Sequence, residues 1–438
     1  MGSSRSLPVS FFLLLTGQSV SILGTQVTIL AIPLTAINLN NAGPAETGAL
    51  LACGRAPYLI LGLFAGVLVD SFSHKQLLFV ANMLMAAALS TLPLGFYWSG
   101  HISMAHLYLV AVTVGIGAVV ADTTFLSWVP SLVPYSLLTH AQSKLELVQS
   151  IATVAGLPFA GWLISRFTSP VAIFVDALSF MFMSLLLLFV PTASSERRVQ
   201  SGIFKVHPHS RQTQWLGSVL KASVEGVSFI LRTPELRAVT FATVTLVFFQ
   251  SAYSAVFIIY LSEILRLAPG TIGMVTSTAA AGGIIGAMLS QPLVRLLGLG
   301  RTLSTSLLAC AAGAVITPLH PGVLGACVSQ CIMWMGIQIY NVHQVPVRYA
   351  MAPKAIYGRV NAGIRTMVWG LAPAGALLGG LCGAYAGLAI TLLLAGSAIA
   401  FSSLWIFFSR IRNVRGAQLS VSGDEFTSLH QSVSGKKS

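Results

Sequence analysis

The sequence predicts an all-α polytopic membrane protein with twelve transmembrane helices in two pseudo-symmetric six-helix bundles, and three observations support this. Apolar residues dominate: 55% of the 438 residues are hydrophobic and 8% are charged, with a mean hydropathy of +0.83, whereas about a quarter of residues are charged in soluble proteins. The apolar sequence falls into segments near the roughly 20 residues that span a bilayer. One long polar interval, 192–235, separates two apolar blocks of similar length.

Glycine, proline, asparagine and charged residues divide the apolar sequence into twelve candidate spans. These are 10–38, 47–69, 76–98, 105–129, 141–165, 170–191, 236–262, 270–294, 302–319, 323–347, 360–385 and 387–408. The first span is long, contains Gln18 and Gln26 and lacks a clear cleavage site, so we interpret it as a helix and not as a removed signal peptide.

These spans predict four parts of the chain. They are an N-terminal six-helix bundle (1–191), a cytoplasmic linker with an amphipathic helix (192–235), a C-terminal six-helix bundle (236–408) and a disordered cytoplasmic tail (409–438). The amphipathic helix is predicted because apolar residues recur at helical spacing from Leu216 to Leu231.

The positions of basic residues orient the chain. A cytoplasmic N-terminus leaves only Arg55, Arg166 and Arg266 of the 24 Lys and Arg residues on or near the outer side. This positive-inside bias predicts a multi-pass protein of the inner (plasma) membrane with both termini in the cytoplasm. Because the net charge of +13 is spread over many short loops, it does not indicate a nucleic-acid partner. The five cysteines fall in apolar segments, so we expect neither disulfides nor a metal site.

A short internal repeat relates the two halves. Gly156-Leu-Pro-Phe-Ala-Gly161 in the fifth span recurs as Gly370-Leu-Ala-Pro-Ala-Gly375 in the eleventh. Equivalent helices six apart indicate a two-fold axis along the membrane normal, with a substrate site between the halves near the midplane.

The loop after the second span reads Gly66-Val-Leu-Val-Asp70-Ser-Phe-Ser-His74-Lys75. It resembles the loop between helices two and three of the major facilitator superfamily, typically Gly-x-x-x-Asp-Arg-x-x-Arg-Arg, and departs from it at Ser71 and His74. In that family the loop latches the two halves on the cytoplasmic side. The resemblance therefore implies a cytoplasmic gate, to which we assign Gly66, Asp70, His74, Lys75, Glu146, Arg359 and Arg365.

Further motifs resemble the drug-proton antiporter branch, which includes macrolide-efflux proteins and the enterobactin exporter. They are Gly17-Gln18-x-x-Ser21-x-Leu23-Gly24, Ala31-Ile-Pro33-Leu34, Asp176-Ala-x-Ser179-Phe180, Glu225-Gly226 with Pro234-x-Leu236-Arg237, and Gly358-Arg359-Val360. Thr25 follows Gly24 where many members carry Asp, so a proton-coupling acid must lie elsewhere.

Ionisable residues inside the membrane are costly, so each is a functional candidate. Asp122 and Glu146 are the candidates for proton coupling, and both are alternatively partners of Arg359, Arg365 or Lys144 in the gate. Arg55 either meets an anionic group of the substrate or pairs with Asp176.

Uncharged polar and aromatic residues form stripes on three spans and predict the lining of a substrate cavity. With Arg55, the predicted lining comprises Gln18, Ser21, Thr25, Thr28, Gln250, Tyr253, Ser254, Phe257, Trp334, Gln338 and Asn341. Polar stripes of this kind also serve helix packing, and that alternative stays open. The glycine pairs Gly62/Gly66 and Gly282/Gly286 and the series Gly375/Gly379/Gly383 are interpreted as close-packing surfaces.

The predicted function is secondary active export of an amphipathic, drug-like small molecule by alternating access, coupled to proton antiport as the resemblance implies. The chain has no Gly-x-x-x-x-Gly-Lys-Ser/Thr phosphate loop, so neither an ATP-driven pump nor another enzyme is expected. The expected partners are the substrate, protons and the lipid bilayer, with no cofactor and a monomeric state. A siderophore exporter is the nearest alternative, and a non-transporting sensor or chaperone on the same fold is the alternative from another class. A metal-ion exporter is disfavoured because carboxylates and histidines are scarce in the stripes.

Overall fold

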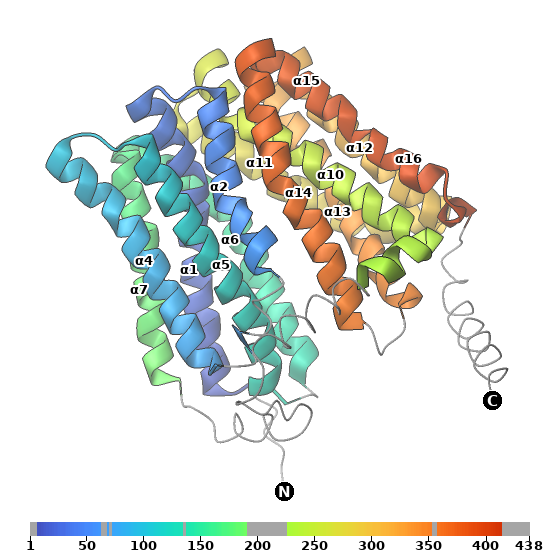
Figure 1. The fold of residues 1–438 in the computed structure, drawn as a ribbon, viewed down its shortest axis with the longest axis horizontal. Helices are drawn as coiled ribbons and strands as arrows, with labels where there is room; N and C mark the ends of the chain where they lie inside the picture. The colour runs from blue at the N-terminus through green and yellow to red at the C-terminus, as the bar shows by residue number, and fades with distance from the viewer. Residues whose placement is uncertain are drawn as a thin grey trace, which may run out of the picture. The chain divides into compact units, whose positions relative to one another are not determined.

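The computed structural model describes residues 7–62, 68–69, 72–134, 137–190, 226–352 and 357–413. Within these ranges the chain forms long helices joined by short turns and contains no strand (Figure 1). The all-α prediction is therefore confirmed. The linker prediction for 192–225 and the tail prediction beyond Asn413 lie outside the described residues.

The helices follow the predicted spans closely. The N-terminal helices are α1 (Val9–Asn40), α2 (Pro44–Leu61), α4 (His74–Ser99), α5 (Met104–Leu132), α6 (Leu138–Arg166) and α7 (Ser169–Phe189). The later elements are α10 (Pro234–Ile259), the π-helix η2 (Tyr260–Ile264), α11 (Pro269–Leu297), α12 (Leu299–Leu319), α13 (Val323–Met351), α14 (Tyr357–Ala386), α15 (Leu388–Ile399), α16 (Phe401–Phe407) and the 3₁₀ turn η4 (Arg410–Asn413).

Eleven helical stretches in the described part of the chain are long and apolar enough to cross a membrane. Each coincides with one predicted span, and the last of them, Leu388–Phe407, combines α15 and α16, which continue in one line in Figure 1. The remaining predicted span, 47–69, coincides with α2 as far as Leu61 and then reaches 63–67, which are not described.

The chain divides into two compact units. Unit 1 comprises Met1–Val219 with Ala255–Ser277, and unit 2 comprises Leu220–Ser254 with Thr278–Ser438. The segment Ala255–Ser277, which holds the end of α10, η2 and the start of α11, thus packs with the N-terminal helices. The predicted boundaries at 191 and 235 remain a prediction.

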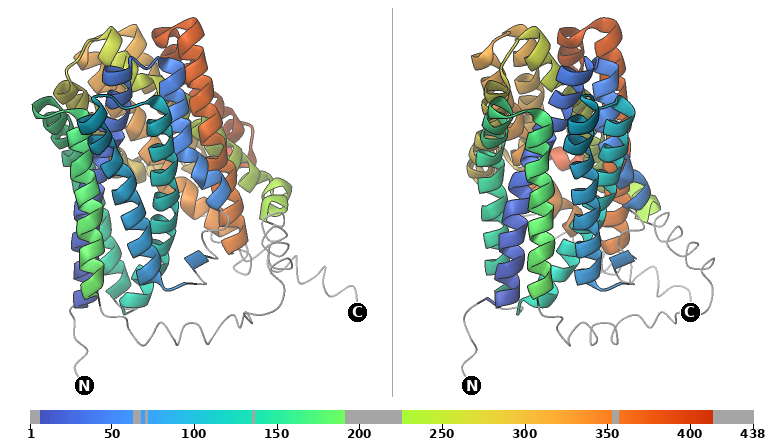
Figure 2. Two further views of the ribbon diagram at one scale, coloured as in Figure 1. Left: turned by 60° about the vertical axis from the view of Figure 1, so that its left-hand side comes forward. Right: turned by 90° about the vertical axis from the view of Figure 1, so that its left-hand side faces the viewer.

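In unit 1, α1 contacts α2, α5, α6 and α7, while α4 lies beside α5 and α7 (Figure 2). Helix α7 shows how the sequence suits a bilayer: Asp176, Ser179 and Ser184 are buried, whereas Leu178 and Leu185 are exposed. Polar side chains thus face neighbouring helices and apolar ones face outward, because a polar group in contact with lipid would lack a hydrogen-bond partner.

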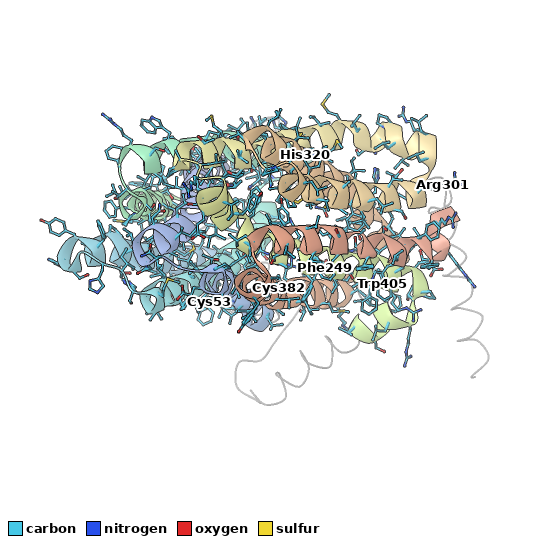
Figure 3. All side chains as sticks on the ribbon, turned by 90° about the horizontal axis from the view of Figure 1, so that it is seen from above. Cys53, Phe249, Arg301, His320, Cys382 and Trp405 are labelled. Atoms are coloured by element: carbon cyan, nitrogen blue, oxygen red, sulfur yellow. The ribbon has the colours of Figure 1, made fainter. Side chains whose placement is uncertain are left out.

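In unit 2, α12 packs against α13, α15 and α16. Trp405 of α16, labelled in Figure 3, stacks on Phe241 of α10 at 5.0 Å between ring centroids and donates its indole N–H to Thr245 Oγ1 at 3.1 Å. The described end of the linker, 226–232, is helical, and its buried Ile230 packs in one apolar cluster with Ile364 of α14. These contacts join α16 to α10 and the linker end to α14.

The orientation gives a topological prediction. Cysteine introduced at Ser195 and at Ser422 should react with an impermeant maleimide only from the cytoplasm, and cysteine at Asn41, which follows α1, only from outside. Mass-tag labelling of intact cells and of everted vesicles measures both. Labelling of position 195 in intact cells would overturn the assignment of the spans.

Candidate functional site

The predicted cavity residues fall into two groups in the structure. Gln18, Thr25, Arg55, Gln250, Ser254 and Gln338 are half-buried, and Trp334 and Asn341 are exposed, whereas Ser21, Thr28, Tyr253 and Phe257 are buried. For the half-buried and exposed residues, the role in lining a cavity stays a prediction. Two of the buried residues, Thr28 and Tyr253, have partners on neighbouring helices, and for them the helix-packing alternative describes the structure better.

A buried carboxyl group joins α1 to α7. Asp176 is 0% exposed, and its Oδ1 accepts a hydrogen bond from the Ser179 hydroxyl at 2.9 Å. The Thr28 hydroxyl of α1 donates to its Oδ2. Gly24 makes room for this group, since a Cβ there would lie 2.4 Å from both Asp176 Oδ1 and Ser179 Oγ.

This arrangement corrects one sequence-based interpretation. Asp176 does not pair with Arg55, because its hydrogen-bond partners in the described part of the chain are Thr28 and Ser179. Its side chain is fully buried. The partner residue is 148 positions away in the sequence, so the sequence alone gave no indication of the contact.

A second carboxylate lies between α2 and α5. Asp122 of α5 is exposed, and its Oδ2 accepts a hydrogen bond from the Tyr58 hydroxyl of α2 at 2.9 Å. The two helices approach closely one to two turns away, where a Cβ at Gly115 would lie 2.4 Å from the Gly54 carbonyl oxygen. Tyr58 was not predicted as a site residue, although its spacing of three residues from Arg55 places both on one face of α2.

The predicted gate residues are partly described. Gly66 and Asp70 lie outside the described residues, while Glu146, Arg359 and Arg365 are exposed. Lys75 donates to the Val190 carbonyl at 2.8 Å and to the Leu188 carbonyl at 3.2 Å. It therefore satisfies carbonyl groups at the C-terminal end of α7, where a cation is favoured by the helix dipole.

The remaining gate candidate, His74, and one possible gate partner, Lys144, interact with aromatic rings. His74 stacks on Trp128, with ring centroids 6.5 Å apart, and Lys144, the possible partner of Glu146, lies 5.9 Å from the Phe12 ring centroid. In this structure His74 and Lys75 thus stabilise contacts inside unit 1, and their role in a gate between the halves stays a prediction.

Unit 2 contains two buried hydroxyl clusters. The Tyr253 hydroxyl of α10 donates to Thr317 Oγ1 at 3.1 Å and lies 3.5 Å from Ser329 Oγ. Nearer the other end of α10, the Tyr340 hydroxyl of α13 donates to the Val239 carbonyl at 3.1 Å, and Arg348 donates to Thr243 Oγ1 at 2.7 Å. Both clusters hold α10 against other helices of the unit.

Glycine contacts confirm part of the predicted packing surfaces. A Cβ at Gly282 would lie 2.0 Å from the Cys331 carbonyl oxygen of α13, and one at Gly379 would lie 2.2 Å from the Ala252 carbonyl oxygen of α10. Gly286 and Gly375 make similar approaches to α13 and α10. Gly62 meets its own helix at Tyr58 instead, so its pairing role is not confirmed.

One close contact was missed by the sequence analysis. In unit 1, a Cβ at Gly273 of α11 would lie 2.5 Å from the Leu157 carbonyl oxygen of α6 and 3.0 Å from the Cα of Gly161. The Gly270 amide also donates to Ser165 Oγ at 2.9 Å. The glycine motif at 156–161 had signalled a special surface on α6, but nothing in the sequence identified the start of α11 as its partner.

Comparison with known proteins gives relatives over most of the chain. The multidrug efflux pump Tap of Mycobacterium tuberculosis is 25% identical over 393 residues, covering 87% of this chain and 89% of that protein. Macrolide efflux protein A of Streptococcus pyogenes is 24% identical over 283 residues, covering 64% of this chain and 66% of that protein.

Solved structures share the fold. A bacterial homologue of the iron transporter ferroportin in its inward-facing state superposes with a TM-score of 0.67 at 18% identity, covering 92% of this chain and 100% of that one. The nucleoside transporter NupG gives 0.68 at 13% identity, with 92% and 100% coverage. The family model of the Major Facilitator Superfamily matches residues 14–253, more than half of the chain, and the chain therefore belongs to the Major Facilitator Superfamily.

Proposed function

We propose that this protein is a secondary active transporter that exports an amphipathic, drug-like small molecule, of which macrolides are the first class to test, in exchange for protons. The observation that carries the proposal is the relationship to a multidrug efflux pump over 87% of the chain. Relatives named for macrolide efflux point in the same direction.

The polar and aromatic groups of the predicted cavity suit such a substrate. Trp334 and Asn341 are exposed on α13, and Gln18 and Thr25 are half-buried on α1. Aromatic faces bind apolar rings, while amides and hydroxyls satisfy a few polar groups, as in most small-molecule sites. Arg55 is the one charged residue of the predicted lining, and the other predicted contacts with the substrate are uncharged.

Asp122 is our candidate for the group that carries the exchanged proton. Its carboxylate is exposed in the structure, and it accepts a hydrogen bond from the Tyr58 hydroxyl, a group that can also accept one. Glu146, exposed on α6, is the second candidate. The absence of a phosphate-binding loop from the sequence supports an ion gradient as the energy source.

Replacing Asp122 tests the proposal. In proteoliposomes with a pH gradient, Asp122→Asn should abolish gradient-driven transport of a radiolabelled macrolide, because the amide cannot release a proton. Exchange of labelled for unlabelled macrolide at equal pH should persist, since binding does not need the charge. The control is Asp122→Glu, which keeps the carboxyl group and should retain a measurable part of the gradient-driven rate.

Two results would count against this assignment. Gradient-driven transport by Asp122→Asn at the wild-type rate would exclude Asp122 and leave Glu146 as the candidate. Wild-type protein that binds no macrolide and accumulates none under a pH gradient would argue against macrolide export itself.

A further inference from the structure

Asp176 carries the only fully buried carboxyl group in the described part of the chain, hydrogen-bonded to Thr28 and Ser179. Asp176 belongs neither to the predicted cavity lining nor to the predicted gate. The surrounding residues leave space for this carboxyl group and supply hydrogen-bond partners for it. Gly24 leaves the space that a Cβ would fill at 2.4 Å from Oδ1, and both carboxyl oxygens have a hydroxyl partner. Three residues of two helices thus form a site around one titratable group.

No cation neutralises this carboxyl among the residues that the structure describes. Helix α1 carries no titratable residue, and Asp176 is the only one on α7. The groups on α4 are His74, Lys75 and Tyr97, near its two ends, and those on α6 are His140, Lys144, Glu146 and Arg166, near its ends as well. None of them contacts Asp176, whose side-chain partners are two neutral hydroxyls.

A buried carboxylate without a cation is unfavourable, and such a group in a protein interior is commonly neutralised by taking up a proton. The hydroxyl partners accommodate both forms, because a hydroxyl can donate a hydrogen bond to a carboxylate and can donate to or accept from a carboxylic acid. The two hydroxyls can therefore hydrogen-bond to Asp176 in either protonation state.

We propose that Asp176 is a proton-binding site, distinct from Asp122, which is protonated in this structure and releases its proton when the contact between α1 and α7 opens to water. The proposal rests on proton-coupled transport as the proposed function. It implies that the contact between α1 and α7 depends on whether Asp176 is protonated. Protonated Asp176 closes the contact through Thr28, whereas the charged form requires hydration.

We expect the proton to move along a stripe of uncharged polar residues on α1. Gln18, Ser21, Thr25 and Thr28 recur at intervals of three or four residues and end at Asp176. The stripe spans about 15 Å, ten residues at the helical rise, and leads toward the predicted cytoplasmic end of the helix. Thr25 and Gln18 are half-buried, so the stripe reaches accessible positions before that end.

Infrared spectroscopy of the purified full-length protein tests the protonation state directly. At neutral pH we expect a carbonyl band of a protonated carboxyl group that shifts in D₂O and is lost in Asp176→Asn. Thr28→Val should move the band to higher frequency, because a hydrogen bond to the carboxyl is removed. The matched control is Thr35→Val on the same helix, whose buried hydroxyl binds the Ala31 carbonyl at 2.7 Å and should leave the band unmoved.

The proposal would be overturned if no carbonyl band depended on Asp176. It would also be overturned if the band did not move in Thr28→Val. The Thr28→Val result alone decides the test if Asp176→Asn does not fold. Transport provides the second arm. Asp176→Asn should lose the response of macrolide transport to a pH gradient while keeping exchange at equal pH, and an unchanged response would overturn release of the proton during transport. If wild-type protein shows no gradient-driven transport, the proposed function fails, and the infrared bands alone decide whether Asp176 binds a proton.

Discussion

Gly282→Ala should strongly destabilise the protein, whereas Gly283→Ala, one residue later on the same helix, should not. A Cβ at Gly282 would lie 2.0 Å from the Cys331 carbonyl oxygen and 2.8 Å from its carbonyl carbon, so α11 and α13 would have to separate. Overpacking of this kind costs about 1–3 kcal/mol and occasionally more. At Gly283 a Cβ would meet nothing within 4 Å.

The two variants form a matched pair, because they add the same methyl group to neighbouring positions. Alanine is a better helix former than glycine by roughly 0.5–1 kcal/mol, so Gly283→Ala should unfold at the wild-type temperature or slightly above it. Thermal unfolding in detergent, followed by tryptophan fluorescence, measures both. Equal melting temperatures for the pair would contradict the close approach of α11 and α13.

Gly273→Ala should shift the conformational equilibrium of the transporter. The added Cβ would lie 2.5 Å from the Leu157 carbonyl oxygen, which penalises the state in which α6 and the start of α11 touch. A penalty of about 1–3 kcal/mol changes a two-state population by about 5–150-fold. States in which these helix ends are apart contain no such clash, so the protein as a whole should remain folded.

Spin labels at Phe167 and Ala268, the positions next to the ends of α6 and α11, report this shift as a longer distance. Gly270→Ala is the control, because its Cβ would meet only the Ser165 hydroxyl at 3.2 Å and the Gly161 carbonyl at 3.9 Å. Identical distance distributions in Gly273→Ala and wild type would show that the contact does not limit the opening of these helices.

Much of the fold was predictable because each spanning helix is a local feature. A run of about 20 apolar residues is sufficient to indicate a span, and this is why the observed helix ends lie within a few residues of the predicted ones for α7 or α12. Glycine spacing also indicated the packing faces of α11 and α14, since only a missing side chain permits such backbone approach.

The candidate site was less predictable because it depends on which faces meet. Thr28 and Tyr253 carried the right chemistry for a cavity, but their hydroxyls reach Asp176 and Thr317 on other helices. The sequence analysis gave Asp176 a role only as a possible partner of Arg55. Its burial follows from the tertiary contact with α1 and from the space left by Gly24. Neither can be predicted from the periodicity of residues within one helix.

The chain crosses between the two compact units at three points, and one of them, between Val219 and Leu220, lies outside the described residues. The other two lie inside helices, between Ser254 and Ala255 in α10 and between Ser277 and Thr278 in α11. A displacement of one unit must therefore bend or twist these two continuous helices. The wider π-helical turn at Tyr260–Ile264 follows the first crossing by about one and a half turns. These helices would deform elastically, storing part of the energy of each displacement of a unit and releasing it when the unit returns.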